Sequence, residues 1–322
     1  IPGKCADEIV KKGRVEYLNE EFYRVQAEKT GHPLMGLIYA YKEACDGNAG
    51  EYVHWGTTTQ DILDTAMVLR LKDVYAIVMG KASAVRKLLA GLAGTHRDTL
   101  MIGRTNDQQA LPITLGLKFA SWLDELNRSA ERLEQGTERI FAGQFFGAVG
   151  TLASFGEPGL ELQKALMEEL GLKCPQMAWF TARDRLAEFT FDLAAMTMCL
   201  GRIGNEVYNE MRSEVAELSE GVMDGNVGSS TMPHKRNPFI SGKLAGYGRM
   251  ARTLMAAAME CMDGTNERDC RALCVEPYFL KDICCLTDGS LDLAIHLLTH
   301  LQVHLGRLDR NLNLLQGLVF SE

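Results

Sequence analysis

Apolar residues recur at helical spacing along most of this 322-residue chain. The stretch 188–220 shows the pattern most clearly, because its apolar side chains fall three or four positions apart: Phe189, Leu193, Met196, Leu200 and Ile203. The stretches 115–133 and 286–315 repeat it, and alternation with a period of two is nowhere sustained. The pattern predicts an all-α fold with helices of roughly 25–35 residues, which is long for a globular protein.

Helices of this length cannot each bury a whole apolar stripe inside a compact monomer of this size. They fit an elongated long-helix bundle whose remaining faces pack against other subunits. Eight prolines punctuate the chain, and long proline-free stretches lie between them. A soft boundary near residue 80, where 73–80 precedes the first long helix, predicts an N-terminal helical domain at 1–79 and a central bundle domain at 80–322.

Composition and charge narrow the class of protein. The chain is 46% hydrophobic and 24% charged, as in ordinary soluble proteins, and its net charge of -8 offers no general attraction for nucleic acid or an anionic membrane. No apolar run reaches the ~20 residues of a membrane span. The nine cysteines include no CxxC pair, which favours reduced thiols in the cytoplasm. An anionic ligand must therefore be bound by a local group of basic side chains.

Three stretches break the helical pattern, and the first is VHWGTTTQDILDTA at 53–66. Thr58 followed by Asp61 resembles a capping box with Asp in place of Glu. The free N–H groups at such a helix start can hold a carboxylate, and His54 can supply a proton or a charge. A plain helix cap with an incidental histidine explains the stretch as well.

The second stretch is IGRTNDQQALP at 102–112. It gathers polar side chains in a predicted loop before Pro112: Arg104, Thr105, Asn106, Gln108 and Gln109. A hydrogen-bonded turn and a binding surface account for it equally well.

The third stretch is GSSTMPHKRNP at 228–238, which is too polar for a core and too rich in proline for a helix interior. Asn237 and Pro238 suit the N-cap and first position of the helix that follows, which places Lys235 and Asn237 at a positive helix end. A basic loop without function remains an alternative on this evidence alone.

Two further patterns predict no site. His296, His300 and His304 recur every four residues, but the outer two lie ~12 Å apart along a helix, so the three cannot bind one ion. No carboxylate or cysteine completes a metal site there, and we expect packing or surface histidines. The methionines at 250–262 are expected to fill the core.

Taken together and in this order, the three stretches resemble the conserved regions of the fumarase/aspartase superfamily. GSSTMPHKRNP matches every fixed position of the signature GSSxMPxKxNP. GAVGT (147–151), TARDRLAEF (181–189) and NERD (266–269) are similar to landmarks of the branch with adenylosuccinate lyase and 3-carboxy-cis,cis-muconate cycloisomerase. The resemblance covers essentially the whole chain, which is expected to begin roughly 40 residues into a typical member and to stop where a small C-terminal helical domain would start.

This resemblance implies a homotetramer with a core of about twenty helices and active sites shared by three subunits. The shared reaction removes a proton from the carbon beside a carboxylate and expels a leaving group from the next carbon. The product is fumarate or a similar alkene, and a cycloisomerase makes or opens a lactone by the same logic. The implied substrate is a small di- or tricarboxylate, with no cofactor and no metal.

The resemblance also assigns roles to residues. Ser229 is the expected general base, and His54 is the histidine placed to donate a proton. A serine hydroxyl becomes a usable base only where water is excluded and Lys235 and nearby N–H groups stabilise the alkoxide. The implied substrate contacts are Thr58, Thr59, Gln60, Arg104, Thr105, Asn106, Gln109, Arg183, Ser230, Met232, Lys235 and Asn237.

Departures from the family pattern bear on the substrate. Asn106 stands where adenylosuccinate lyases carry a His, and Gly242 stands where they carry a supporting Glu. Losing both fits a leaving group that needs no proton, such as the carboxylate of a lactone, and favours a cycloisomerase-like enzyme, although cycloisomerases commonly have a His at Gln109. The alternatives are a C–N lyase of the adenylosuccinate lyase type and a non-catalytic tetrameric relative.

Overall fold

The computed structural model describes residues 1–221, 232 and 235–320. The chain forms two compact units. Unit 1 comprises Ile1–Leu71, Phe141–Thr181 and Thr265–Asp269, and unit 2 comprises Lys72–Ile140, Ala182–Gly264 and Cys270–Glu322. Ser229 and Ser230 lie outside the described residues.

Unit 1 consists of short helices and turns. Its elements are α1 (Gly3–Lys12), α2 (Glu20–Thr30), α3 (Pro33–Ala44), α6 (Gly159–Glu169) and the 3₁₀ turns Val15–Tyr17, Ala49–Tyr52 and Ala153–Phe155. Local sequence explains the ends of α2, since the Asn19 side chain accepts a hydrogen bond from Phe22 N and Gly31 ends the helix at φ 63°. Leu34, Ile38 and Val53 form an apolar cluster beside these helices.

Helix α4 (Thr59–Thr95) begins in unit 1 and continues into unit 2. Residues 73–80, which the sequence pattern marked as preceding the first long helix, lie inside this 37-residue helix. The placement of that helix start was therefore wrong. A single Gly80 weakens a helix by only about 1 kcal/mol and does not end it.

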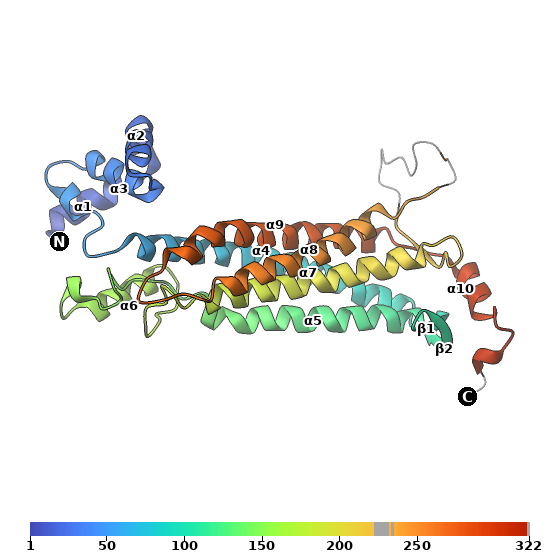
Figure 1. Cartoon of the computed structure of the whole chain (residues 1–322). Helices are drawn as coiled ribbons and strands as arrows, with labels where there is room; N and C mark the ends of the chain where they lie inside the picture. Colours follow the sequence, from blue (N-terminus) through green and yellow to red (C-terminus); the bar gives the residue numbers. More distant parts are fainter. Residues whose placement is uncertain (222–231, 233–234, 321–322) are drawn as a thin grey trace. The chain divides into compact units, whose positions relative to one another are not determined.

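Unit 2 contains the other long helices, which run side by side (Figure 1). They are α5 (Leu115–Ile140), α7 (Asp184–Glu210), α8 (Phe239–Glu260) and α9 (Cys270–Thr299), followed by α10 (Leu305–Leu312) and the 3₁₀ turn Leu318–Phe320. The apolar stripe predicted on α7 is confirmed, because all five of its side chains are fully buried. Gly201 of α7 lets α8 approach closely, since an added Cβ would lie 2.9 Å from the Gly248 Cα.

The predicted all-α class is confirmed, with two small antiparallel ladders as additions. They pair β1 (Leu100–Thr105) with β2 (Gln108–Thr114) and β3 (Leu218–Ser219) with β4 (Gln302–Val303). The stretch 102–112, expected to be a loop, is thus mostly a hairpin. Asn106 and Asp107 form its two-residue turn at φ 51° and 61°, a conformation that Asn and Asp adopt readily.

Helices α8 and α9 and the chain after them correct three smaller expectations. Pro277 does not interrupt α9 but lies within it. The helix ends at Thr299, and His304 caps α10, so the three spaced histidines do not share one helix. Met250 and Met259 are half exposed and not core residues.

The described part of the chain contains neither a membrane-spanning helix nor a cluster of metal-binding side chains. No described helix is long and apolar enough to cross a lipid bilayer. No three His, Cys, Asp or Glu side chains among residues 1–221, 232 and 235–320 are grouped to hold a metal ion. All nine cysteines are free thiols.

Candidate active site

The start of α4 carries the first conserved region. Asp61 Oδ2 accepts a hydrogen bond from Thr58 N at 3.0 Å, which confirms the carboxylate half of the predicted capping box. The Thr58 hydroxyl does not complete the box. It accepts a bond of 2.6 Å from Arg268 Nη1, so a cation lies directly against this helix start. Thr59 is the first residue of α4 and is partly exposed.

Asp61 also holds the segment 146–147 against α4. Its Oδ1 accepts from Phe146 N at 2.8 Å and its Oδ2 accepts from Gly147 N at 3.0 Å. Burial raises the pKa of Asp61, although the three N–H bonds and the charge of Arg268 oppose the rise. Gly147 opens the GAVGT motif, so one carboxylate joins two of the stretches that the sequence marked.

Two more of those stretches meet in the same unit. The guanidinium of Arg268, from NERD, lies 5.8 Å from the ring centre of Phe180. Phe180 O accepts a bond of 2.9 Å from the buried Gln60 side chain, and the Thr181 hydroxyl donates to Asn266 O at 3.1 Å. Unit 1 therefore gathers the first region, GAVGT, the start of TARDRLAEF and NERD around one helix end.

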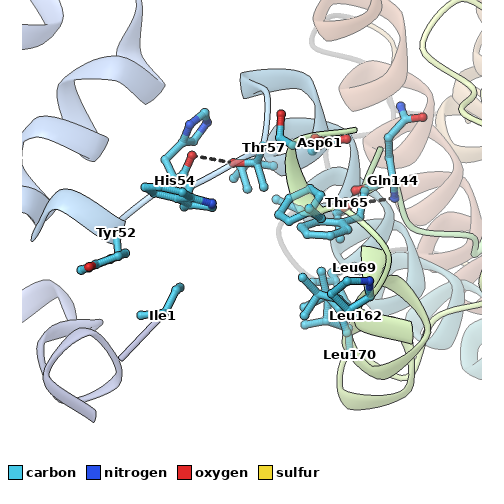
Figure 2. A pocket seen from close by; sticks show the side chains of 18 residues that line it. Ile1, Tyr52, His54, Thr57, Asp61, Thr65, Leu69, Gln144, Leu162 and Leu170 are labelled. Carbon is cyan, nitrogen blue, oxygen red and sulfur yellow. Dashed lines mark hydrogen bonds between the residues drawn. The ribbon is translucent and has the colours of Figure 1, made fainter. Parts of the chain in front are cut away.

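His54 lies beside this helix end in a left-handed conformation with φ 67°. Its carbonyl accepts a bond of 3.2 Å from the Thr57 hydroxyl, as Figure 2 shows. Its Nε2 is buried and has no hydrogen-bond partner among the described residues. Burial, followed by the charge of Lys42, lowers the pKa of His54, so the imidazole is predominantly neutral at pH 7.

A cavity of about 780 Å³ adjoins His54 in unit 1. Its walls are mainly apolar, and Figure 2 shows Leu69, Leu162 and Leu170 together on the side opposite Tyr52. None of the described residues that line it is a lysine or arginine. A polycarboxylate would lose its hydration there without gaining a cation, so this cavity does not suit such a substrate.

The second conserved region lies in unit 2 at the β1–β2 hairpin. Arg104 is half buried and forms a two-pronged ion pair with Glu217, with Nη1–Oε2 at 2.9 Å and Nη2–Oε1 at 2.6 Å. Thr105 and Asn106 are exposed at the hairpin end, and Gln109 Oε1 is buried without a hydrogen bond in the described structure. The hairpin thus presents polar groups beside an arginine that is already paired.

Arg183, another predicted substrate contact, lies in the interior of unit 2. Its side chain is fully buried and forms an ion pair with Glu276, with Nε–Oε1 at 2.5 Å and Nη2–Oε2 at 2.7 Å. This geometry is that of a buried ion pair that stabilises the fold.

The signature segment is described at Met232 and 235–238. Met232 and Lys235 are exposed, and Asn237 is half buried. The predicted cap was wrong, because Pro238 is the N-cap of α8 and no side chain at that position makes a capping bond. Glu220 replaces it, accepting from Ile240 N and Ser241 N at 3.1 and 2.9 Å.

Comparison with known proteins identifies the family. Residues 22–249 match the family model described as Lyase. Adenylosuccinate lyase of Methanocaldococcus jannaschii is 39% identical over 324 residues, covering 100% of this chain and 70% of that protein. The chain belongs to the fumarase/aspartase superfamily of lyases.

Two further matches represent different members of this superfamily. N-acetyl-S-(2-succino)cysteine lyase of Dickeya dadantii is 40% identical over 322 residues, covering 100% of this chain and 71% of that protein. The crystal structure of 3-carboxy-cis,cis-muconate lactonizing enzyme from Pseudomonas putida superposes with a TM-score of 0.92 at 34% identity. It covers 100% of this chain and 72% of that chain.

Sequence reasoning missed two residues that hold these helix starts in place. It marked NERD but gave Arg268 no role, and no spacing rule links Arg268 to Thr58 because 210 positions separate them. It also missed Glu220, whose helix contacts lie 20 and 21 positions away. In the sequence, the one sign of this role is that Glu220 is an acidic residue shortly before a loop and the helix that follows it.

Proposed function

We propose that this lyase catalyses reversible β-elimination on a small di- or tricarboxylate, with a fumarate-like product. The complete signature GSSTMPHKRNP in a chain of this family carries the proposal. Ser229 is the general base, and the proposed activity is of the 3-carboxy-cis,cis-muconate cycloisomerase type. The nine free cysteines support a cytoplasmic location.

The reaction requires stabilisation of negative charge on the substrate carboxylate. The base takes the proton from the adjacent carbon, the C–H electron pair forms the double bond, and the leaving group departs with its own electron pair. Donors aimed at the carboxylate lower this barrier. The hydroxyl of Thr58 with Arg268 beside it, together with Lys235 and Asn237, supplies the types of donor needed.

A tetramer whose active sites draw on three subunits is part of the proposal. Long helices of unit 2 expose large apolar side chains that water does not favour: Phe191, Met198, Met250, Met259 and Tyr278. Such faces commonly pack against other subunits in long-helix proteins. On this proposal the first region, the hairpin and the signature segment at one site come from different chains.

Asn106 and His54 both favour a leaving group that departs as a stable anion. Asn106 is the first of the two left-handed residues of the hairpin turn and carries no acidic proton. The lowered pKa of His54 leaves little imidazolium at neutral pH. Amines and hydroxide leave poorly without a proton, whereas a carboxylate or a thiolate does not need one. We therefore rank lactone carboxylate or thiolate expulsion above amine expulsion.

A substrate panel tests the function. The purified protein is incubated with a carboxylated lactone, an S-succino thioether and an N-succino amine, and the conjugated product is followed by ultraviolet absorbance. We expect turnover of the lactone or the thioether. Exclusive turnover of the amine would instead assign the protein as a C–N lyase.

A non-catalytic tetrameric relative is the second candidate, and Asn106 in place of the family histidine favours it. Tight binding of a dicarboxylate without turnover of any panel member would establish this alternative and overturn the proposed elimination.

A further inference from the structure

The run Glu217–Glu220 lies a few residues before the signature segment at 228–238. Leu218 and Ser219 form β3, which pairs with β4. The Ser219 hydroxyl lies 2.8 Å from His304 Nε2, and His304 N donates to Glu217 O at 2.9 Å. These bonds fix the backbone of the run against the chain that follows α9.

Glu220 extends from this run to the start of α8. Its two oxygens accept from Ile240 N at 3.2 and 3.1 Å, and Oε2 also accepts from Ser241 N at 2.9 Å and the Ser241 hydroxyl at 3.1 Å. Only 9% of Glu220 is exposed. A buried carboxylate is stable here because helix N–H groups and the positive helix end compensate its charge.

Glu217, at the other end of the run, holds the second conserved region. Its carboxylate binds both terminal nitrogens of Arg104 and accepts from Asn311 Nδ2 at 2.7 Å. Glu217 is fully buried, so its carboxylate is shielded from water. One run of four residues therefore connects the β1–β2 hairpin to the first turn of α8.

We propose that Glu220 is a positioning residue for the elimination: it fixes the first turn of α8, and with it the place where Lys235 and Asn237 meet that helix. Glu217 fixes the Arg104 hairpin from the same run. Glu220 acts through the Ile240 and Ser241 amides and does not touch the substrate, because both of its oxygens are engaged by α8. This inference rests on the proposed function.

The same arrangement gives Arg104 a structural role in place of the substrate contact expected from the sequence. Both terminal nitrogens of its guanidinium are bound by Glu217, and Glu210 Oε2 lies 3.6 Å away. An arginine so paired has little capacity left for a substrate carboxylate. It holds the hairpin in place and leaves Thr105, Asn106 and Gln109 as the groups of that hairpin available to a ligand.

The test compares Glu220→Gln and Glu220→Asp with the control Glu214→Gln in the intact protein. Glu214 is an exposed glutamate on the same segment with no bond in the described structure. Two quantities are measured: steady-state kcat and KM on the substrate identified by the panel, and amide hydrogen exchange in peptides covering residues 239–244.

We expect Glu220→Gln to lower kcat by about tenfold to a hundredfold with KM changed less than about threefold, because misplacement by about 1 Å has effects of this size. Glu220→Asp keeps the charge and should recover part of the rate. Exchange at residues 239–244 should rise in the Gln variant, and Glu214→Gln should match the wild type in both measurements.

The outcomes separate this inference from the proposed function. Normal kcat in Glu220→Gln, in an enzyme that turns over its substrate, overturns the positioning role and leaves the elimination intact. Wild-type protein without turnover overturns the elimination. In that case, unchanged exchange at residues 239–244 in Glu220→Gln also overturns the capping role, whereas raised exchange supports it.

Discussion

Helices α4 and α8 both begin at a conserved region, and a buried carboxylate caps each of them from a different direction. At α4 the carboxylate is Asp61, in the first turn of the same helix, and it binds Thr58 N. At α8 it is Glu220, which lies 20 residues before Ile240 and outside the helix. The two helix starts are alike in chemistry and differ in how the sequence encodes them.

The two carboxylates limit what these helix starts can offer to a substrate. The start of α4 was expected to offer free N–H groups to a carboxylate, and the start of α8 was expected to be a positive helix end near Lys235 and Asn237. Each of them already faces a carboxylate of the protein. The positive ends are thereby partly neutralised. On the proposed function, side-chain cations and hydroxyls would then bind the substrate, and Arg268 beside Thr58 is one such pair of groups.

The largest effect is expected for Asp61→Ala, which leaves three backbone N–H groups without their acceptor. Each orphaned buried donor costs about 1–3 kcal/mol, so unfolding free energy should fall by at least about 3 kcal/mol. Asp61→Asn keeps one acceptor oxygen and should lose less. Urea unfolding followed by circular dichroism measures both, and a loss below about 1 kcal/mol for the alanine variant contradicts the account.

Replacing a buried carboxylate that lacks such donors should stabilise the folded protein, whereas replacing Asp61 should destabilise it. Asp192 on α7 is buried, and its Oδ2 lacks a hydrogen bond among the described residues. Burial, with a smaller contribution from Glu188, raises the pKa of Asp192 from 3.8 to about 6 against the opposing charges of Arg132 and Arg139. The folded protein therefore binds more protons than the unfolded chain between these values.

Stability from Asp192 is thus fully present below about pH 4 and is lost as pH rises through about 6, by about 2–3 kcal/mol. Asp192→Asn should remove this slope and stabilise the protein above neutral pH. The exposed Asp73→Asn serves as the control. Unfolding free energy measured across pH 4–8 tests this prediction. A pH dependence of that free energy that is the same in Asp192→Asn as in the wild type would contradict it.

Glu220→Gln should reduce stability less than Asp61→Ala does, by about 1–2 kcal/mol. The amide retains one acceptor for the α8 amides, and the main loss is the attraction between the charge and the helix end. Thermal unfolding of this variant beside Glu214→Gln measures the difference. A loss as large as that of Asp61→Ala would remove the distinction between the two caps.

The smallest effect is expected for Thr58→Val, which removes only the bond from Arg268. Arg268 is an exposed residue and can bind water instead, so the loss should be at most about 1 kcal/mol. The matched variant is Thr57→Val. A loss above about 2 kcal/mol would show that Arg268 is a structural element of unit 1 and not an available cation.

The sequence predicted those features that depend on neighbouring residues. The buried stripe from Phe189 to Ile203 follows from helical spacing, and the Thr58–Asp61 bond follows from a three-residue motif. The signature segment led to the family. Each of these signals is contained within about one or two dozen residues, where periodicity and capping rules apply.

The features that sequence reasoning missed depend on contacts between distant segments. Nothing in the sequence near Arg183 shows that Glu276 neutralises it, or that Glu217 holds Arg104. The hairpin at 100–114 was overlooked because its apolar residues Met101 and Ile102 are adjacent and do not alternate with polar ones. Such pairings arise from tertiary packing, which local patterns do not record.

The central claim is that the first serine of the pair in the signature segment takes the proton. The most direct measurement compares kcat for Ser229→Ala and Ser230→Ala on the substrate found by the panel, with circular dichroism to verify folding. The account predicts a loss of about a hundredfold or more for Ser229→Ala and a clearly smaller loss for Ser230→Ala. Undiminished turnover by folded Ser229→Ala would contradict it.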